Sequence, residues 1–171
     1  MHPDLQHIQQ AIDHAVRGMS SEQLAWHQNG KWSAAAILEH LSLTYSGTAK
    51  SLQRCLKAGQ PSITAANWRQ RVAGFVVTGL RYMPGGRQAP AMVLPKGAAP
   101  ETVLVDVQRN LAAADDAISR CEAQFGASSK IANHPILGPL TAEQWRIFHL
   151  VHGRHHMKQI TRIRGQMVNR G

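Results

Sequence analysis

With 171 residues, 43% of them hydrophobic, the chain has the composition of a single globular domain that spans residues 1–171. The sequence has neither a secretory signal pattern nor an apolar run of the ~18 residues that span a membrane, so we expect no membrane partner. Its two cysteines form no CxxC pair, which fits a reducing compartment, so we expect a cytoplasmic protein. The net charge of +9 suits an anionic partner, but the basic residues are spread out, with modest clusters at 69–71 and 154–170, and a solvated positive surface explains them as well.

The first part of the chain predicts two amphipathic helices joined by a capped turn. Residues 4–18 repeat apolar side chains at helical spacing. Ser20 and Gln23 have the spacing of a capping box, which begins a short helical turn. Ser33 is a good N-cap for a long helix that runs to about residue 58 and stops before Gly59.

The middle of the chain predicts a weaker helix and a long loop. Residues 67–80 place apolar side chains on one helical face, although Gly74 and Gly79 weaken the pattern and a strand over 75–78 is an alternative. Residues 84–100 are rich in proline and glycine around an apolar centre at 91–94. We therefore expect a packed loop that serves as a lid or a brace.

Two further helices complete a predicted all-α fold with long loops. Residues 102–125 carry an inward apolar stripe, and the adjacent Asp115 and Asp116 on that helix are interpreted as a solvated pair because neighbouring helical residues diverge. Residues 126–140 are predicted to form a second loop. Thr141 and Gln144 form another capping box, so the last helix is predicted over 141–165.

The last predicted helix carries the candidate site. His152 and His156 lie one turn apart on the same face, and two imidazoles at this spacing can bind one metal ion. His149 extends the stripe as a fourth ligand or as a group that supports one, and the Gln159 amide can hydrogen-bond the second nitrogen of a ligand. A histidine-rich helix without metal is the alternative, so the pair needs a third ligand from another helix.

A single histidine on the second long helix is the candidate for that third ligand. His40 sits at the edge of the apolar stripe over 33–58, where a lone histidine is more often a partly buried structural residue. Only the pair on the last helix gives it weight as a ligand. Its neighbour Glu39 is interpreted as a surface carboxylate.

Three stretches of the chain resemble motifs of the DinB-like superfamily. Trp32-Ser33 followed by Ile37-Leu38-Glu39-His40-Leu41 resembles the motif of its second helix. The run His152-Gly153-Arg154-His155-His156-Met157-Lys158-Gln159-Ile160 is similar to the motif of its last helix. The stretch from His134 to Thr141, with Trp145 and His149, resembles a DinB-related branch of unknown function. Taken in their order along the chain, these landmarks span residues 26–160.

The resemblance implies a fold, a metal and a class of chemistry. The fold is a four-helix bundle, up-down-down-up, with a crossover connection. The family's ligands for a divalent metal, usually zinc or nickel, fall on His40, His152 and His156 of this chain. Characterised relatives include thiol S-transferases and maleylpyruvate-isomerase-like enzymes, which implies a small-molecule substrate and a low-molecular-weight thiol cofactor. A homodimer is expected by family analogy alone.

Several functions stay open at this point. Three imidazoles leave a metal with open positions, as in catalytic sites, where it can deprotonate a thiol for transfer or a water for hydrolysis. His149 or Glu39 could move protons in a hydrolase, and Arg81, Arg154 or Lys158 could hold an anionic thiol. The alternatives are a non-catalytic metal-binding or interaction module and, with only net charge in its favour, a nucleic-acid binder, which we do not expect.

Overall fold

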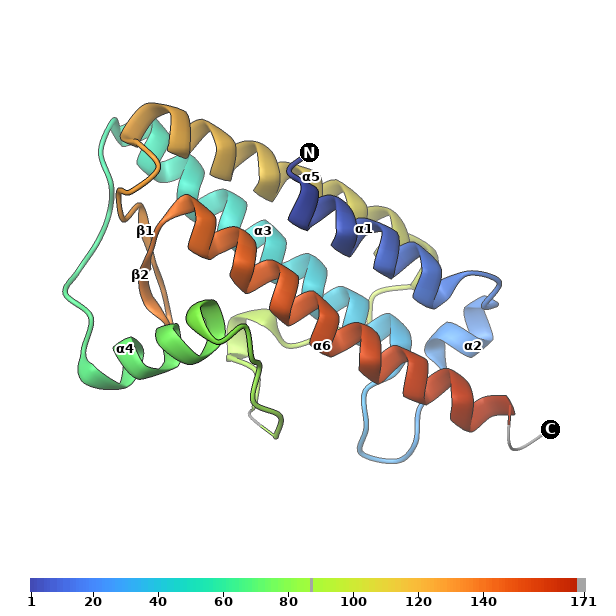
Figure 1. Ribbon diagram of the computed structural model, residues 1–171. Coiled ribbons are helices and arrows are strands. Elements are labelled where there is room, and N and C mark those ends of the chain that lie inside the picture. The colour runs from blue at the N-terminus through green and yellow to red at the C-terminus, as the bar shows by residue number, and fades with distance from the viewer. Residues whose placement is uncertain (87, 169–171) are drawn as a thin grey trace.

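The computed structural model describes residues 1–86 and 88–168, the last of them for its backbone only. Its body is a bundle of four long helices: α1 (Pro3–Val16), α3 (Ala34–Ala58), α5 (Pro100–Phe125) and α6 (Ala142–Val168). α1 and α6 run one way while α3 and α5 run the other, with a crossover between the adjacent, parallel α3 and α5 (Figure 1). The predicted up-down-down-up bundle is confirmed. Within the described residues, no helix is both long and apolar enough to cross a membrane.

The ends of the helices follow from the local sequence. The Ser33 hydroxyl oxygen accepts a backbone N–H from the first turn of α3 at 3.0 Å, and α3 ends at Gly59, whose φ of 69° favours glycine. Thr141 and Gln144 form the predicted capping box of α6, with each side-chain oxygen accepting the other's backbone N–H. A capping box also begins the short helix α2 (Ser21–Ala25), as predicted.

The bundle helices bury the apolar stripes that periodicity predicts. The stripe of α1 contributes Leu5, Ile8, Ile12 and Ala15 to the core, and that of α5 contributes Val103, Val107, Leu111, Ala114 and Ile118. α1 packs closely on α6 at Gly153, where an added Cβ would lie 2.7 Å from Ile8 Cδ1. Glycine therefore permits the close approach of the two helices next to His152.

Asp115 departs from its predicted place on a solvated face. Its side chain is buried, and its Oδ1 accepts the backbone N–H of His2 at 3.2 Å. Asp116 is exposed and pairs with Arg120, as expected of a solvated residue. The interpretation of Asp115 is wrong because the start of α1 covers that turn of α5, a contact that the periodicity of one helix does not reveal.

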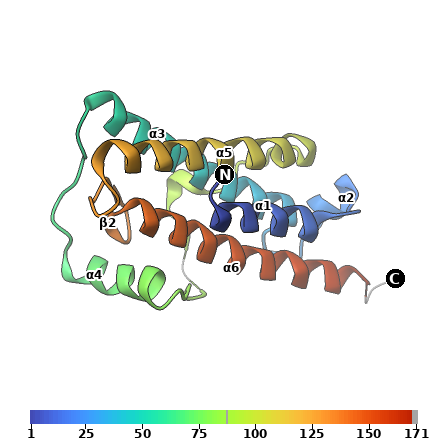
Figure 2. The ribbon, with the colours of Figure 1, turned by 45° about the horizontal axis from the view of Figure 1, so that its top comes forward.

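The crossover contains helical turns of three kinds. α4 (Trp68–Gly74) continues into a π-helical turn, η1 (Phe75–Gly79), and a 3₁₀ turn, η2 (Ala91–Val93), follows. The Leu80 N–H donates to the Phe75 carbonyl at 2.9 Å, the spacing of a π-helix. The helix predicted over 67–80 thus changes from α to π after Gly74, a weak helix former. The alternative of a strand over 75–78 is wrong. In Figure 2, α4 lies below α6, outside the bundle.

The segment 126–140, predicted as a loop, contains a small antiparallel hairpin. β1 (Ala132–His134) pairs with β2 (Gly138–Leu140), and His134 lies opposite Gly138. Ser62 from the crossover forms an isolated parallel bridge to Ala132. The loop prediction is corrected here, because strands of three residues are too short to show an alternating pattern in the sequence.

Candidate metal centre

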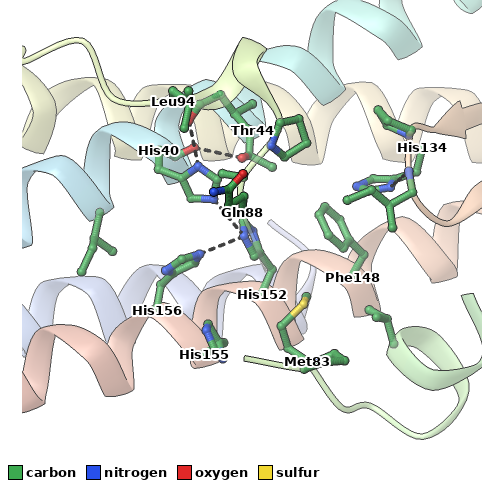
Figure 3. Close-up of a pocket in the computed structure, with 18 of the residues that line it drawn as sticks. His40, Thr44, Met83, Gln88, Leu94, His134, Phe148, His152, His155 and His156 are labelled. Atoms are coloured by element: carbon green, nitrogen blue, oxygen red, sulfur yellow. Dashed lines mark hydrogen bonds between the residues drawn. The ribbon is translucent and has the colours of Figure 1, made fainter. Parts of the chain in front are cut away.

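Three histidines from two helices meet between α3 and α6. His40 lies on α3, and His152 and His156 lie one turn apart on α6. The Nε2 atom of His152 is 3.1 Å from that of His40 and 3.0 Å from that of His156. All three side chains are buried, and one ligand atom of each lies within 4.8 Å of the others. Figure 3 shows their rings turned toward one another across the space between the helices.

The ring of His40 is held by the crossover. Its Nδ1 lies 2.8 Å from the carbonyl oxygen of Val93. A carbonyl can only accept, so Nδ1 carries the proton and Nε2 presents its lone pair to the other two histidines. Val93 is the last residue of η2, so the segment 84–100 braces this side chain.

Glu39 anchors the part of the crossover that follows Val93. Its carboxylate oxygens accept three consecutive backbone N–H groups, those of Lys96 at 2.9 Å, Gly97 at 3.0 Å and Ala98 at 3.1 Å. The residue is only 8% exposed. The prediction of a surface carboxylate is therefore wrong, because the crossover covers this side of α3. With both oxygens engaged, the carboxylate is not placed to move protons.

His156 is held from its own helix. Its Nδ1 lies 2.8 Å from Gln159 Oε1, which accepts the ring proton, and the amide nitrogen of Gln159 lies 3.2 Å from His155 Nε2. The Nε2 of His156 is thereby left with its lone pair facing His152. The role of Gln159 as support for a metal ligand stays a prediction, and this contact is what such a role requires.

The surroundings keep the three imidazoles neutral. Burial lowers the pKa of His40, against the opposing effect of its hydrogen bond to Val93. Burial and then the neighbouring histidines lower the pKa of His152 well below its usual range. Burial and the nearby His40 lower the pKa of His156 to about 3. Neutral imidazole is the form that binds metal ions.

The three imidazole nitrogens are arranged as ligands of a metal cation would be. His40 and His156 both direct an Nε2 lone pair at the Nε2 of His152. A neutral His152 has one ring proton and can satisfy only one of them, while its own Nδ1 is buried without a partner among the described residues. A cation between the three nitrogens removes this conflict, and imidazole nitrogens suit zinc and nickel.

His149, expected as a fourth ligand or a supporting group, lies apart from the three converging nitrogens. It is fully buried, with ring centres 5.1 Å from Tyr45 and 6.1 Å from Trp145. Neither ring nitrogen has a hydrogen-bond partner among the described residues. Burial and the nearby His134 lower its pKa to about 3. Its role at the site stays a prediction.

The three histidines border a cavity of about 1430 Å³. Its walls come from α3 and the segment before it, the crossover, the hairpin and α6, with apolar side chains such as Met83 and Phe148 beside the histidines (Figure 3). Its ionised lining residues are all basic, and no Asp or Glu occurs among the described residues of the wall. These basic residues are Lys31, Arg54, Arg69 and Arg162.

Sequence reasoning missed those basic residues. The side chains it considered for an anionic thiol, Arg81, Arg154 and Lys158, do not line the cavity. It also missed the Val93 carbonyl and the carboxylate contacts of Glu39, since both depend on the path of the crossover. The glycine and proline content of residues 84–100 was the available signal, and it indicated a brace without naming its contacts.

Comparisons with known proteins address the family and the fold. A family model described as "Protein of unknown function (DUF1569)" matches residues 4–163. No curated protein matches the chain. Among solved structures, YfiT from Bacillus subtilis is similar, with a TM-score of 0.61 at 19% sequence identity over 96% of this chain and 83% of that one. YfiT is described as a probable metal-dependent hydrolase with an unusual four-helix bundle topology. The likeness confirms the four-helix bundle fold.

Proposed function

The chain belongs to the DUF1569 family of proteins of unknown function, and from that premise we propose that it is a divalent-metal-dependent enzyme that uses His40, His152 and His156 as its metal ligands. The observation that carries the proposal is the convergence of three buried Nε2 atoms. Two of the rings are oriented by oxygen acceptors, Val93 and Gln159, in the way that metal-ligating histidines usually are. Zinc or nickel is the proposed metal.

The cavity favours an enzyme over a non-catalytic metal-binding module. Structural zinc sites are closed by four protein ligands, whereas three imidazoles leave coordination positions open. A metal held there would act as a Lewis acid that lowers the pKa of a thiol or a water. The three histidines border a cavity wide enough to admit an organic molecule, which a structural site or an interaction module does not need.

The finer proposal is a thiol S-transferase that works with a low-molecular-weight thiol. The cavity of about 1430 Å³ exceeds the ~300–1,000 Å³ of common single-ligand pockets, which suits a reaction of two molecules. The thiol has to come from a small molecule, because Cys55 and Cys121 are both buried in the core and do not line the cavity. Metal-assisted loss of the thiol proton needs no carboxylate base, which the described wall does not offer.

A metal-dependent hydrolase is the second candidate. The similarity of fold to YfiT, which is described as a probable metal-dependent hydrolase, is the observation in its favour. Both candidates share the metal site and differ in the nucleophile.

We also propose a homodimer, from the family resemblance, and a location in the cytoplasm, which the free state of both cysteines suits. Light scattering on the purified chain tests the dimer.

Metal content tests the shared part of the proposal. Purified, tag-free protein should contain near-stoichiometric zinc or nickel by elemental mass spectrometry, and the double variant His152→Ala/His156→Ala should contain none. His155→Ala is the matched control, because His155 neighbours His156 outside the converging group. A wild-type protein that binds no divalent metal even after reconstitution would overturn the enzyme proposal.

The two candidates are then separated with the metal-loaded protein. Thiols are screened against electrophilic acceptors, and esters and amides are screened as hydrolysis substrates without thiol. Thiol-dependent consumption of an electrophile that disappears in His152→Ala/His156→Ala supports the transferase. Thiol-independent hydrolysis that disappears in the same variant supports the hydrolase.

A further inference from the structure

His134 lines the cavity at its hairpin end. It is the last residue of β1 and lies in the wall shared with the three candidate ligands. Its ring centre is 4.4 Å from that of Phe148, and Phe148 stacks on His152 at 5.3 Å. Figure 3 shows His134 on the far side of Phe148 from His152. Two successive ring contacts therefore connect His134 to the candidate metal centre.

The hairpin determines which nitrogen of His134 carries the proton. Nδ1 accepts the backbone N–H of Ile136 at 3.1 Å and that of Leu137 at 3.2 Å. A ring nitrogen that accepts hydrogen bonds has no proton, so in the neutral ring the proton is on Nε2. Burial lowers the pKa of His134 to about 4, which agrees with a neutral ring.

The remaining Nε2–H is a donor without a partner among the described residues. Nδ1 makes both of the hydrogen bonds that the ring forms with the described residues. The described wall of the cavity contains no carboxylate that could accept from it, and its ionised residues, such as Arg54 and Arg69, are donors themselves. A fixed donor in a wall whose ionised residues are all donors is suited to an acceptor that arrives with the ligand. Neutral imidazole is able to bind and polarise a carbonyl oxygen in this way.

We propose that His134 orients the small molecule bound in this cavity, by donating its Nε2–H to an acceptor oxygen of a carbonyl or carboxylate group. The proposal deepens the proposed function and rests on it in one respect, namely that the molecule so held reacts at the neighbouring metal site. A molecule without such an oxygen leaves the donor unpaired, so the cavity discriminates against it. The basic lining residues extend the same preference to anionic oxygen.

Two substitutions separate this role from the role of His134 in the hairpin. His134→Asn puts an amide oxygen near the place of Nδ1, so it keeps the acceptor for residues 136 and 137 and removes the donor. His134→Gln reaches the place of Nε2 with its amide NH₂, so it keeps a donor and weakens the hairpin contacts. A purely structural residue would tolerate asparagine better than glutamine in every measurement, including ligand binding.

The test uses three probes that share a phenyl ring: phenylacetate, phenylacetamide and toluene. Each is titrated into the full chain, with and without zinc, and its affinity is measured by NMR together with the ¹⁵N-imidazole signal of His134. We expect the two oxygen-bearing probes to shift the His134 Nε2–H signal and to bind about tenfold more tightly than toluene. His134→Asn should abolish that preference, and His134→Gln should retain it. Preference for phenylacetate over phenylacetamide would identify the anion as the better ligand.

The outcomes that overturn the proposal are distinct from those that overturn the enzyme. Equal affinities of the three probes for wild type, the absence of saturable binding, or a preference that survives in His134→Asn each overturn the assignment of His134. Zinc content is measured in every sample. Wild-type protein that shows the oxygen preference but binds no metal removes the enzyme proposal and leaves His134 as a ligand-orienting residue.

Discussion

The Nδ1 atom of His40 lies 2.8 Å from the carbonyl oxygen of Val93, a residue 53 positions further along the chain. This contact ties a candidate ligand on α3 to the crossover. Glu39, one residue before His40, accepts three N–H groups just beyond Val93. Two adjacent side chains of α3 therefore act on one segment: Glu39 anchors it, and the anchored segment orients the His40 ring.

Glu39→Gln should weaken metal binding although Glu39 is not a ligand. The amide offers one oxygen where the carboxylate offers two, so part of the anchor is lost and Val93 is less well fixed. We expect zinc affinity to fall by about 10–100-fold, as for other groups that orient a metal ligand. The free energy of unfolding of the metal-free protein should fall by about 1–3 kcal/mol. Chelator competition and urea unfolding measure the two effects.

Glu22→Gln is the matched control for that experiment. Glu22 is exposed on α2, so its substitution should leave both zinc affinity and stability within error. A Glu39→Gln protein with lower stability but wild-type zinc affinity would show that Glu39 supports only the fold and does not act on His40.

Gly153→Ala should destabilise the protein. The added Cβ would lie 2.7 Å from Ile8 Cδ1 and 3.1 Å from its Cγ1 and Cγ2, and Ile8 is fully buried. α1 and α6 must move apart to accept it, at about 1–3 kcal/mol of the free energy of unfolding. Urea denaturation measures the change, and the metal content of the same protein reports whether the shift reaches His152.

The control lies on the same helix. Gly165 has open space around its Cβ position, so Gly165→Ala should stabilise α6 by up to about 1 kcal/mol, the usual gain of alanine over glycine in a helix. Ile8→Val removes the closest atom and should recover part of the stability of Gly153→Ala. An equal gain from alanine at both glycines would mean that the two helices do not pack as described.

The helices could be predicted from the sequence because their signals are local. The caps at Ser33 and Thr141 and the apolar stripes lie within a few residues of the elements that they define. The hairpin and the π-helical turn were missed because three-residue strands and a single wide turn leave no periodic signal.

The candidate site depended on contacts distant in sequence. His152 and His156 were recognised as a pair from their spacing. His40 lies 112 positions before His152, and it gained weight only from the need of that pair for a third ligand and from a family resemblance. The burial of Glu39 and of Asp115 could not be read from their own helices, because each is covered by another segment. The orientation of His134 likewise depends on two backbone N–H groups that the hairpin brings to its ring.

Acid should destabilise the metal-free protein well above the pKa range of its carboxyl groups. Burial and the nearby His134 lower the pKa of His149 to about 3, against about 6.5 in the unfolded chain, so the unfolded state binds more protons below pH 6.5. The contribution of neutral His149 to the free energy of unfolding is complete above that pH and is lost as pH falls toward 3. The slope from this one group is up to about 1.4 kcal/mol per pH unit. Urea unfolding between pH 7 and 4.5 measures it.

His149→Phe isolates this contribution. Phenylalanine cannot take up a proton. It suits this position because His149 lies beside the rings of Tyr45 and Trp145, and neither ring nitrogen of His149 has a partner among the described residues. Its stability relative to wild type should therefore grow steadily as pH falls from 6.5 to 4.5. A stability difference that does not change with pH would mean that His149 is not the buried neutral group described.

Gln159→Leu should weaken metal binding through His156. Leucine cannot accept the Nδ1–H that Gln159 Oε1 accepts at 2.8 Å, so the ring loses its orientation and its proton is left unpaired. Zinc affinity should fall about tenfold or more, whereas Gln159→Glu, which supplies a stronger acceptor, should match or exceed wild type. Because Gln159 also contacts His155, His155→Ala serves as the control and should leave zinc affinity unchanged. If leucine and glutamate at position 159 give the same affinity, the acceptor has no bearing on the metal, and His156 is held by its helix alone.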